Sequence, residues 1–213
     1  MTNPGAGDFF ERQFQRQVRE ADFSLNPFEQ LALSHVTGNV LDLGCGLGNL
    51  SLEAARRGCR VTAVDASATA IERVRATALH ERLPLEALHA DLACFRIEQD
   101  YDTIVAIGLL MFFRRERALD LLRQIEQRIR PGGRAIVNVL IEGTTYLGMF
   151  KPGEYYLFAA NELEHAFAGW NLLVARRDSF PAPADTCKEF ATVIAQKTQN
   201  QPPGGPNPAG PDR

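Results

Sequence analysis

The chain of 213 residues is long enough for one sizeable hydrophobic core, and we expect a single main domain. Hydrophobic residues make up 45% and charged residues 23% of the sequence, and the formal net charge is −3. This composition is typical of a globular protein and excludes a bulk electrostatic attraction toward nucleic acid or an anionic membrane.

Residues 1–36 form a predicted helical leader ahead of the main domain. Phe10, Phe14 and Val18 follow a spacing that gives the first helix one apolar face. A second helix is expected over residues 29–35. Two roles fit the leader equally well: packing against the edge of a sheet, or a lid over a bound molecule.

A glycine-rich loop follows the first predicted strand. Gly44, Gly46 and Gly48 alternate between a short apolar strand and helix-compatible sequence. Glycine leaves the backbone open to a ligand and permits positive φ, and the next helix directs free N–H groups at whatever is bound there. The loop therefore predicts a site for a small, nucleotide-like molecule. The dinucleotide fingerprint G-x-G-x-x-G would need a glycine where Asn49 stands, which argues against a nicotinamide cofactor.

Acidic residues follow the next two predicted strands. Asp65 ends the apolar run that starts at Cys59, and it lies seventeen residues beyond Gly48. An acid about 20 residues beyond such a loop can accept hydrogen bonds from both ribose hydroxyls. Asp91 ends a third strand, predicted over residues 85–90. Either acid alone would suit a helix N-cap, but their succession after a glycine loop favours one ligand held by three strand ends.

Strands and helices alternate through the centre of the chain. Two further strands are expected over residues 101–108 and 134–141, the second entered through a turn at residues 130–133. Helices are expected over residues 49–58, 67–81 and 116–129. This alternation predicts an α/β fold with a doubly wound, mostly parallel sheet and helices on both faces.

The pattern changes after the fifth strand. Asn161 is expected to cap a short helix. Strands over residues 170–176 and 189–195, joined by a Pro-containing connection, predict an antiparallel hairpin. The main domain therefore spans residues 37–197. Residues 198–213 are rich in Pro, Gly and Asn and are expected to form a disordered tail.

This order of motifs resembles the class I S-adenosylmethionine-dependent methyltransferases over residues 40–197. In that family the glycine loop lies against the methionine part of the cofactor, and the two acids bind the ribose and the adenine amine. The resemblance implies a seven-stranded sheet with an antiparallel last strand, and S-adenosyl-L-methionine as the cofactor. The cofactor-binding residues that it implies are Asp42, Gly44, Cys45, Gly46, Gly48, Asp65, Ala66, Asp91, Leu92, Ile107 and Met111.

Within this superfamily the chain is most similar to the small tellurite-resistance type of methyltransferase. The similarity rests on Leu109-Leu-Met-Phe112 after the fourth strand, on Gly169-Trp170, and on the final strand sequence at residues 190–197. The tellurite enzymes are expected to carry a His-Arg pair between the last two strands. Residues 179–187 instead read Ser-Phe-Pro-Ala-Pro-Ala-Asp-Thr-Cys, so the resemblance does not extend to tellurite as the substrate.

The implied reaction is in-line transfer of the sulfonium methyl group to a small-molecule acceptor. A soft sulfur, selenium or tellurium nucleophile needs no general base, whereas a small metabolite with a hydroxyl or amine is helped by one. Acceptor residues are expected after the fourth and fifth strands, at Met111, Phe112 and residues 142–150. Tyr146 and Glu142 are the candidate catalytic residues in this region.

Two alternatives remain open. A NAD(P)-dependent oxidoreductase shares the sheet and the ribose acid, but it does not fit Asn49, Asp91 or the antiparallel ending. A module that binds S-adenosylmethionine without transferase activity fits every motif, because a fold does not fix a function.

Metal ions, membranes and nucleic acids are not expected as partners. The four cysteines are scattered without C-x-x-C spacing, which argues against a metal site and a disulfide framework. The sequence shows no signal-like apolar region and no apolar run of membrane-spanning length, so we expect a cytoplasmic protein. Arginine-rich stretches at residues 12–19 and 114–117 contain acids and are expected to be solvated helix faces. A monomer and a homodimer are both compatible with the sequence.

Overall fold

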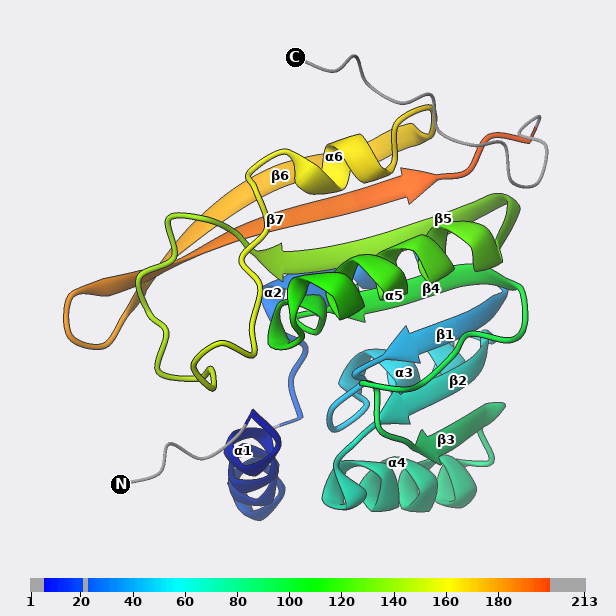
Figure 1. Ribbon diagram of the computed structural model, residues 1–213. Coiled ribbons are helices and arrows are strands. Elements are labelled where there is room, and N and C mark those ends of the chain that lie inside the picture. Colours follow the sequence, from blue (N-terminus) through cyan, green and yellow to red (C-terminus); the bar gives the residue numbers. More distant parts are fainter. Residues whose placement is uncertain (1–5, 21–22, 200–213) are drawn as a thin grey trace.

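The computed structural model describes residues 6–20 and 23–199 of the chain, which form one seven-stranded sheet flanked by helices (Figure 1). The strand order is β3-β2-β1-β4-β5-β7-β6. The helices and strands are α1 (Ala6–Glu20), α2 (Pro27–Leu33), β1 (Asn39–Leu43), α3 (Asn49–Arg56), β2 (Arg60–Asp65), α4 (Ala68–Glu81), β3 (Leu85–His89), β4 (Tyr101–Ile107), η1 (Leu110–Phe112), α5 (Arg115–Arg128), β5 (Ile129–Leu140), α6 (Glu162–Ala166), β6 (Asn171–Ala182) and β7 (Thr186–Gln196).

The sheet is mostly parallel, with one reversed strand. β1 to β5 pair with parallel neighbours, whereas β7 runs antiparallel to both β5 and β6. This confirms the predicted doubly wound sheet with an antiparallel last strand.

The central strands are buried on both faces. Successive side chains of a strand point to opposite sides of the sheet. On β4, Ile104 and Ala106 accordingly pack with α5, while Val105 packs in the cluster formed by α2, α3 and α4. Both helix layers cover apolar strand residues, as a parallel sheet requires.

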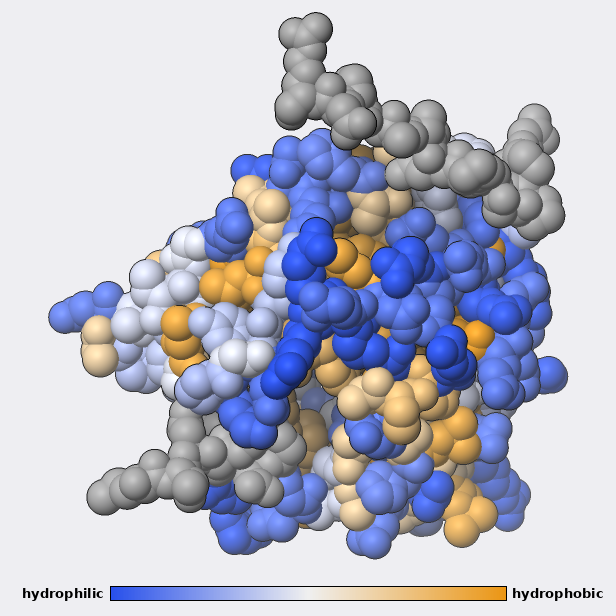
Figure 2. All heavy atoms as spheres, in the orientation of Figure 1, coloured by the Kyte–Doolittle hydropathy of each residue, from blue (hydrophilic) through white to orange (hydrophobic). Residues whose placement is uncertain are grey.

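The carboxyl ends of β1, β2, β4 and β5 all point to the same side of the molecule, where α1 also lies (Figure 1). The strand order reverses between β1 and β4, because β2 continues to one side and β5 to the other. In open α/β sheets, ligands bind in the crevice at this reversal. The fold thus places a binding site next to the glycine loop. Polar residues cover most of the face drawn in Figure 2, and hydrophobic residues lie there in separate patches.

Two details of the predicted elements were wrong. The turn at residues 130–133 lies inside β5, as an irregularity where Tyr101 pairs with Ile129 but Thr103 pairs with Arg134. Pro131 provides no N–H for the ladder, and Gly132 has a φ of 81°, so the chain bulges there without leaving the sheet.

The strands of the hairpin are longer than predicted; Pro181 belongs to β6, whereas Pro183 lies in the connection, as predicted. Pro181 pairs with Cys187, and the turn is confined to residues 183–185. β6 is an edge strand, where a missing N–H is tolerated. Asn161 is the N-cap residue of α6, as predicted, although its side chain makes no cap hydrogen bond; the Glu162 carboxylate instead accepts a hydrogen bond from the Ala159 N–H at 2.9 Å.

The predicted disordered tail falls mostly on residues 200–213, which lie outside the described residues.

Candidate active site

The glycine loop connects β1 to α3 with three residues in the left-handed region. Gly44, Gly46 and Gly48 have φ values of 70°, 52° and 73°. A Cβ at Gly44 would lie 3.0 Å from the side chain of Leu109, and a Cβ at Gly46 would lie 3.2 Å from the ring of Phe14. Both the conformation and the lack of space therefore favour glycine at these positions.

Gly48 differs from the other two glycines because it does not line the cavity beside the loop. A Cβ on Gly48 would lie 2.4 Å from Val74 Cγ2 on α4. Gly48 lies where the start of α3 packs closely against α4. Helix packing is the role that the third glycine has in dinucleotide-binding loops, and here it is met one residue earlier than in that fingerprint.

Asp65 connects the glycine loop to the start of α4. The Gly46 N–H donates to Asp65 Oδ2 and the Ser67 N–H donates to Asp65 Oδ1, both at 2.8 Å. Burial raises the pKa of Asp65, and the hydrogen bonds from Ser67, Gly46 and Ala66 oppose that rise. The carboxylate thus lies at the strand end, beside the loop, as the sequence predicted.

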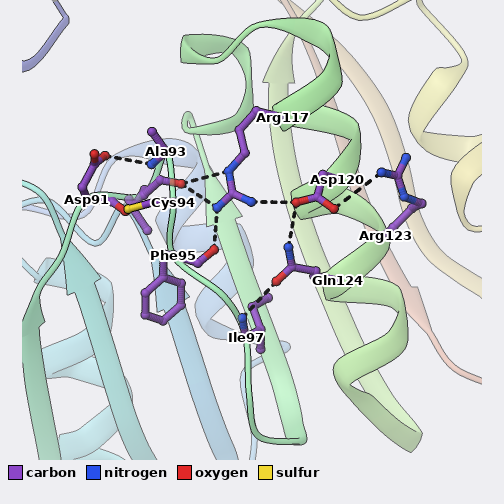
Figure 3. A network of polar contacts seen from close by, with 10 residues as sticks. Asp91, Ala93, Cys94, Phe95, Ile97, Arg117, Asp120, Arg123 and Gln124 are labelled. Atoms are coloured by element: carbon purple, nitrogen blue, oxygen red, sulfur yellow. Dashed lines mark hydrogen bonds and ion pairs between the residues drawn. The ribbon is translucent and has the colours of Figure 1, made fainter.

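Asp91 and Leu92 begin the connection from β3 to β4, which Arg117 of α5 fixes in place (Figure 3). The Arg117 guanidinium donates to the Leu92 carbonyl at 2.7 and 3.1 Å and to the Phe95 carbonyl at 2.5 Å. It also pairs with Asp120 at 2.7 Å. Arg117 is only 18% exposed, so the prediction of a solvated face at residues 114–117 was wrong for this residue.

Asp42 is a buried acid at the end of β1. The Ser51 hydroxyl donates to Asp42 Oδ2 at 2.5 Å. Burial raises the pKa of Asp42 to about 7, with smaller contributions from the negative charges of Glu29 and Asp65. Burial also raises the pKa of Glu29, which lines the same cavity. These acids together favour a positively charged ligand.

A cavity of about 940 Å³ lies over the carboxyl ends of β1, β2 and β4. Its volume is near the upper end of the ~300–1,000 Å³ typical of small-molecule sites. Burial raises the pKa of the Cys45 thiol, which keeps it protonated and supports a packing role. The predicted cofactor residues that line the cavity are Asp42, Gly44, Cys45, Gly46, Asp65, Ala66, Asp91, Leu92, Ile107 and Met111.

The leader helix α1 forms part of the cavity wall. The ring of Phe10 packs edge-on against Phe112 with centroids 4.9 Å apart. Glu11 accepts hydrogen bonds from Ser67, at 2.5 Å, and from Thr69 at the start of α4. Phe14 lies against Gly46, so α1 covers the glycine loop directly.

The two candidate catalytic residues do not reach the cavity. Glu142 is exposed, and neither Glu142 nor Tyr146 lines the cavity, although Met111, Phe112 and Met149 from the predicted acceptor regions do. Residues directly after a strand end can turn outward, and the turn at Gly143, with a φ of 98°, follows Glu142 immediately.

Several cavity residues were not predicted. They are Phe28 and Glu29 of α2, Asn49 of α3, Asn138 of β5, Phe180 of β6, and Lys188 and Phe190 of β7. Asn138 interrupts the apolar run of residues 135–141, which is a sequence signal for it, whereas Lys188 lies beside Glu189 and has no such signal. Within the described ranges, no cluster of three His, Cys, Asp or Glu residues could hold a metal ion. No helix among them is long and apolar enough to cross a membrane.

The sheet order, the glycine loop and the acids at the strand ends are those that the resemblance to class I methyltransferases implies. Residues 40–133 match the family model described as a methyltransferase domain. Residues 40–133 of the chain are therefore similar to a methyltransferase domain, and S-adenosylmethionine is the cofactor that this similarity indicates.

Comparison with known proteins supports this assignment. The chain is 32% identical over 133 residues to Hemagglutinin 1 of Eikenella corrodens, covering 62% of this chain and 44% of the relative. It is 30% identical over 135 residues to the probable S-adenosyl-L-methionine-dependent methyltransferase TehB of Haemophilus influenzae, covering 63% of this chain and 46% of the relative. The chain thus spans less than half the length of these curated relatives.

Solved structures share the fold. The crystal structure of TehB from Haemophilus influenzae superposes with a TM-score of 0.72 at 23% identity, covering 91% of this chain and 67% of TehB. The similarity to TehB confirms the resemblance to the tellurite-resistance type. The fold also superposes on a 1,6-didemethyltoxoflavin-N1-methyltransferase from Burkholderia thailandensis, with a TM-score of 0.65 at 20% identity. That structure contains bound 1,6-didemethyltoxoflavin and S-adenosylhomocysteine. That match covers 91% of this chain and 87% of that protein.

Proposed function

We propose that this protein transfers a methyl group from S-adenosylmethionine to a small-molecule acceptor. The observation that supports this most directly is the cavity, which joins an acidic half at the glycine loop to a largely aromatic half beside β5, β6 and β7. A cationic cofactor suits the first half, and an organic acceptor suits the second.

The residues of the acidic half fit the cofactor. Gly44 and Gly46 leave the loop backbone free of side chains, and Asp65 lies where ribose hydroxyls would donate to it. Asn49 Oδ1 is buried without a hydrogen-bond partner among the described residues. An unpaired acceptor atom at this wall is suited to the ammonium group of a bound methionine moiety. Burial raises the pKa of Asp42 and of Glu29 nearby, and a cation bound beside them would favour their charged forms.

When bound, the cofactor would supply an activated methyl group and would leave as S-adenosylhomocysteine, while the acceptor would provide the lone pair for the new bond and lose its proton to solvent. The protein's own residues orient the two molecules and exclude water. The walls formed by Phe14, Leu109, Met111 and Phe112 suit this role because they are apolar and close over the loop.

Titration calorimetry tests the proposal. S-adenosylhomocysteine is expected to bind, and NADH is not, because the loop lacks the spacing for a pyrophosphate. Asp65→Ala should weaken S-adenosylhomocysteine binding by about 1–3 kcal/mol, since it removes charge-assisted hydrogen bonds. Unchanged affinity in that variant would remove Asp65 from the site.

A second function, cofactor binding without transfer, is separated by an activity measurement. Labelled methyl transfer to thiol, selenite, hydroxyl and amine acceptors is expected for an enzyme. Cofactor binding with no transfer to any acceptor class would favour the binding module. The leader helix α1 is proposed as a lid, since Phe14 lies on the glycine loop.

A further inference from the structure

The half of the cavity away from the glycine loop has its own set of lining residues. Asn138 comes from β5, Lys188 and Phe190 from β7, Phe180 from β6, and Phe28 from α2. We call these five residues the acceptor wall. None of them belongs to the glycine loop or to the acids at the strand ends, so the cofactor assignment does not account for them.

Asn138 holds an unpaired hydrogen-bond acceptor at this wall. Its side chain is fully buried, and its Nδ2 donates to Thr192 Oγ1 at 2.9 Å. Its Oδ1 has no hydrogen-bond partner among the residues that the structure describes. An unsatisfied buried acceptor costs on the order of 1–3 kcal/mol, and such groups are rare in folded proteins. A ligand O–H or N–H is the partner that this oxygen lacks.

The position of Asn138 places it next to the transfer point. Asn138 pairs with Ile107 across the sheet, and its carbonyl accepts a hydrogen bond from the Gly108 N–H at 3.0 Å. Ile107 and Met111 on that side line the cavity with the cofactor residues. A group bonded to Asn138 would therefore lie where acceptor and cofactor meet.

Lys188 provides a cation without an acidic partner. It is the only Lys or Arg among the described residues that line the cavity, and its ammonium lies 4.9 Å from the ring centroid of Tyr146. No ion pair joins it to a carboxylate within the described part of the chain. Burial lowers the pKa of Lys188, which an anionic ligand would reverse. The contact with Tyr146 positions the ammonium but leaves its charge available.

The strand geometry orders these features along one line. Lys188, Phe190 and Thr192 alternate on β7 and so share a face of the sheet. At about 3.3 Å per residue, the backbones of Lys188 and Thr192 lie roughly 13 Å apart, with Phe190 between them. The Phe190 ring lies 4.9 Å from Phe28 and 5.8 Å from Phe180, centroid to centroid. Along β7, the hydrogen-bond acceptor of Asn138 beside Thr192, the aromatic ring of Phe190 and the cation of Lys188 therefore follow one another.

We propose that the methyl acceptor is an anionic aromatic molecule whose nucleophilic hydroxyl or amine bonds to Asn138, whose ring packs on Phe190, and whose carboxylate or similar group pairs with Lys188. The assignment rests on the proposed methyl transfer. Asn138 acts as a positioning residue. Its Oδ1 accepts a hydrogen bond from the nucleophilic O–H or N–H group, so that the lone pair of the nucleophilic atom is free to point toward the methyl group. The proton released on transfer passes to water, since a carboxamide does not take it up.

The assignment is tested with 4-hydroxybenzoate and with two probes that each lack one of its groups. Benzoate lacks the hydroxyl, and methyl 4-hydroxybenzoate lacks the negative charge. Their binding to the protein saturated with S-adenosylhomocysteine is measured by calorimetry. We expect 4-hydroxybenzoate to bind about tenfold more tightly than either of the others, because it alone carries both groups. Asn138→Leu should reduce its affinity to that of benzoate without changing benzoate binding. Lys188→Met should weaken both carboxylates and leave the ester unchanged.

Lys151→Met is the matched control, because Lys151 is exposed, pairs with Glu154 and does not line the cavity. Should Asn138→Leu fold poorly, the side-chain amide signal of Asn138 in the unaltered protein serves instead. It should shift with 4-hydroxybenzoate and not with benzoate. The acceptor assignment would be overturned if a substitution weakened the binding of all three probes equally, or if none of the probes bound. In either case, binding of S-adenosylhomocysteine would still uphold the proposed function. Failure of S-adenosylhomocysteine to bind would overturn the proposed function itself.

Discussion

Replacing Arg117 by leucine should loosen the wall of the site that carries Asp91 and Leu92. The Arg117 guanidinium donates to two carbonyls of the connection between β3 and β4 and pairs with Asp120 (Figure 3). Hydrogen bonds to charged groups contribute about 1.5–3 kcal/mol each, and water replaces part of what is lost. Because the side chain is only 18% exposed, we expect a loss of about 2–4 kcal/mol in the free energy of unfolding.

The same substitution should weaken cofactor binding. Leu92 is both a hydrogen-bond partner of Arg117 and a lining residue of the cavity, so movement of its backbone alters the site. We expect the dissociation constant of S-adenosylhomocysteine to rise about tenfold, which corresponds to roughly 1.4 kcal/mol. Urea unfolding measures the stability, and calorimetry on the folded variant measures the affinity.

Arg123→Leu is the matched control. Arg123 lies on the same helix and pairs with the same Asp120, but at 3.5 Å and with a side chain that is 60% exposed. An exposed ion pair of this kind contributes about 0–1 kcal/mol. Equal effects of the two substitutions, or wild-type affinity in Arg117→Leu, would refute the idea that Arg117 fixes this wall.

Three further predictions concern the cavity and its surroundings. Burial raises the pKa of Asp42 to about 7, so between about pH 4 and 7 the folded protein keeps a proton that the unfolded chain has released. Stability should therefore fall as pH rises through this window, by on the order of 3 kcal/mol, and Asp42→Asn should flatten the dependence in urea unfolding. Gly48→Ala should cost about 2–4 kcal/mol of stability, and a cycle with Val74→Ala should show coupling of about 1 kcal/mol or more; additive effects would disprove the contact. If α1 is a lid, Phe14→Ala should speed S-adenosylhomocysteine dissociation in stopped flow with little loss of stability, whereas a pure packing role predicts the reverse.

The cofactor half of the site could be predicted because its signals are short-range. The loop glycines and Asp65 each stand at the end of an apolar run, and parallel strands bring such ends together. Gly48 shows the limit of this reasoning. The spacing placed it with Gly44 and Gly46, but its space requirement comes from Val74 on another helix, which no local pattern reveals.

The other half could not be predicted in the same way. Asn138 and Lys188 lie within strands, and their place in one wall of the cavity depends on the antiparallel pairing of β7 with β5. The prediction placed Pro181 in the connection between the last two strands, although at the sheet edge a proline can stay in the strand. Glu142 was expected in the site from its place after β5, yet the chain turns it toward solvent.

The β6–β7 hairpin extends past the parallel strands on the side where α1 lies (Figure 1). It supplies Phe180, Lys188 and Phe190, but none of the loop or acidic residues assigned to the nucleoside. Under the proposed assignment, the hairpin thus supplies three of the five residues of the acceptor wall, so exchange of this segment should change the selectivity for the acceptor while the residues proposed to bind the methyl donor stay the same. A library of substitutions at Phe180, Lys188 and Phe190 is therefore a suitable first step to redesign the proposed selectivity for the methyl acceptor.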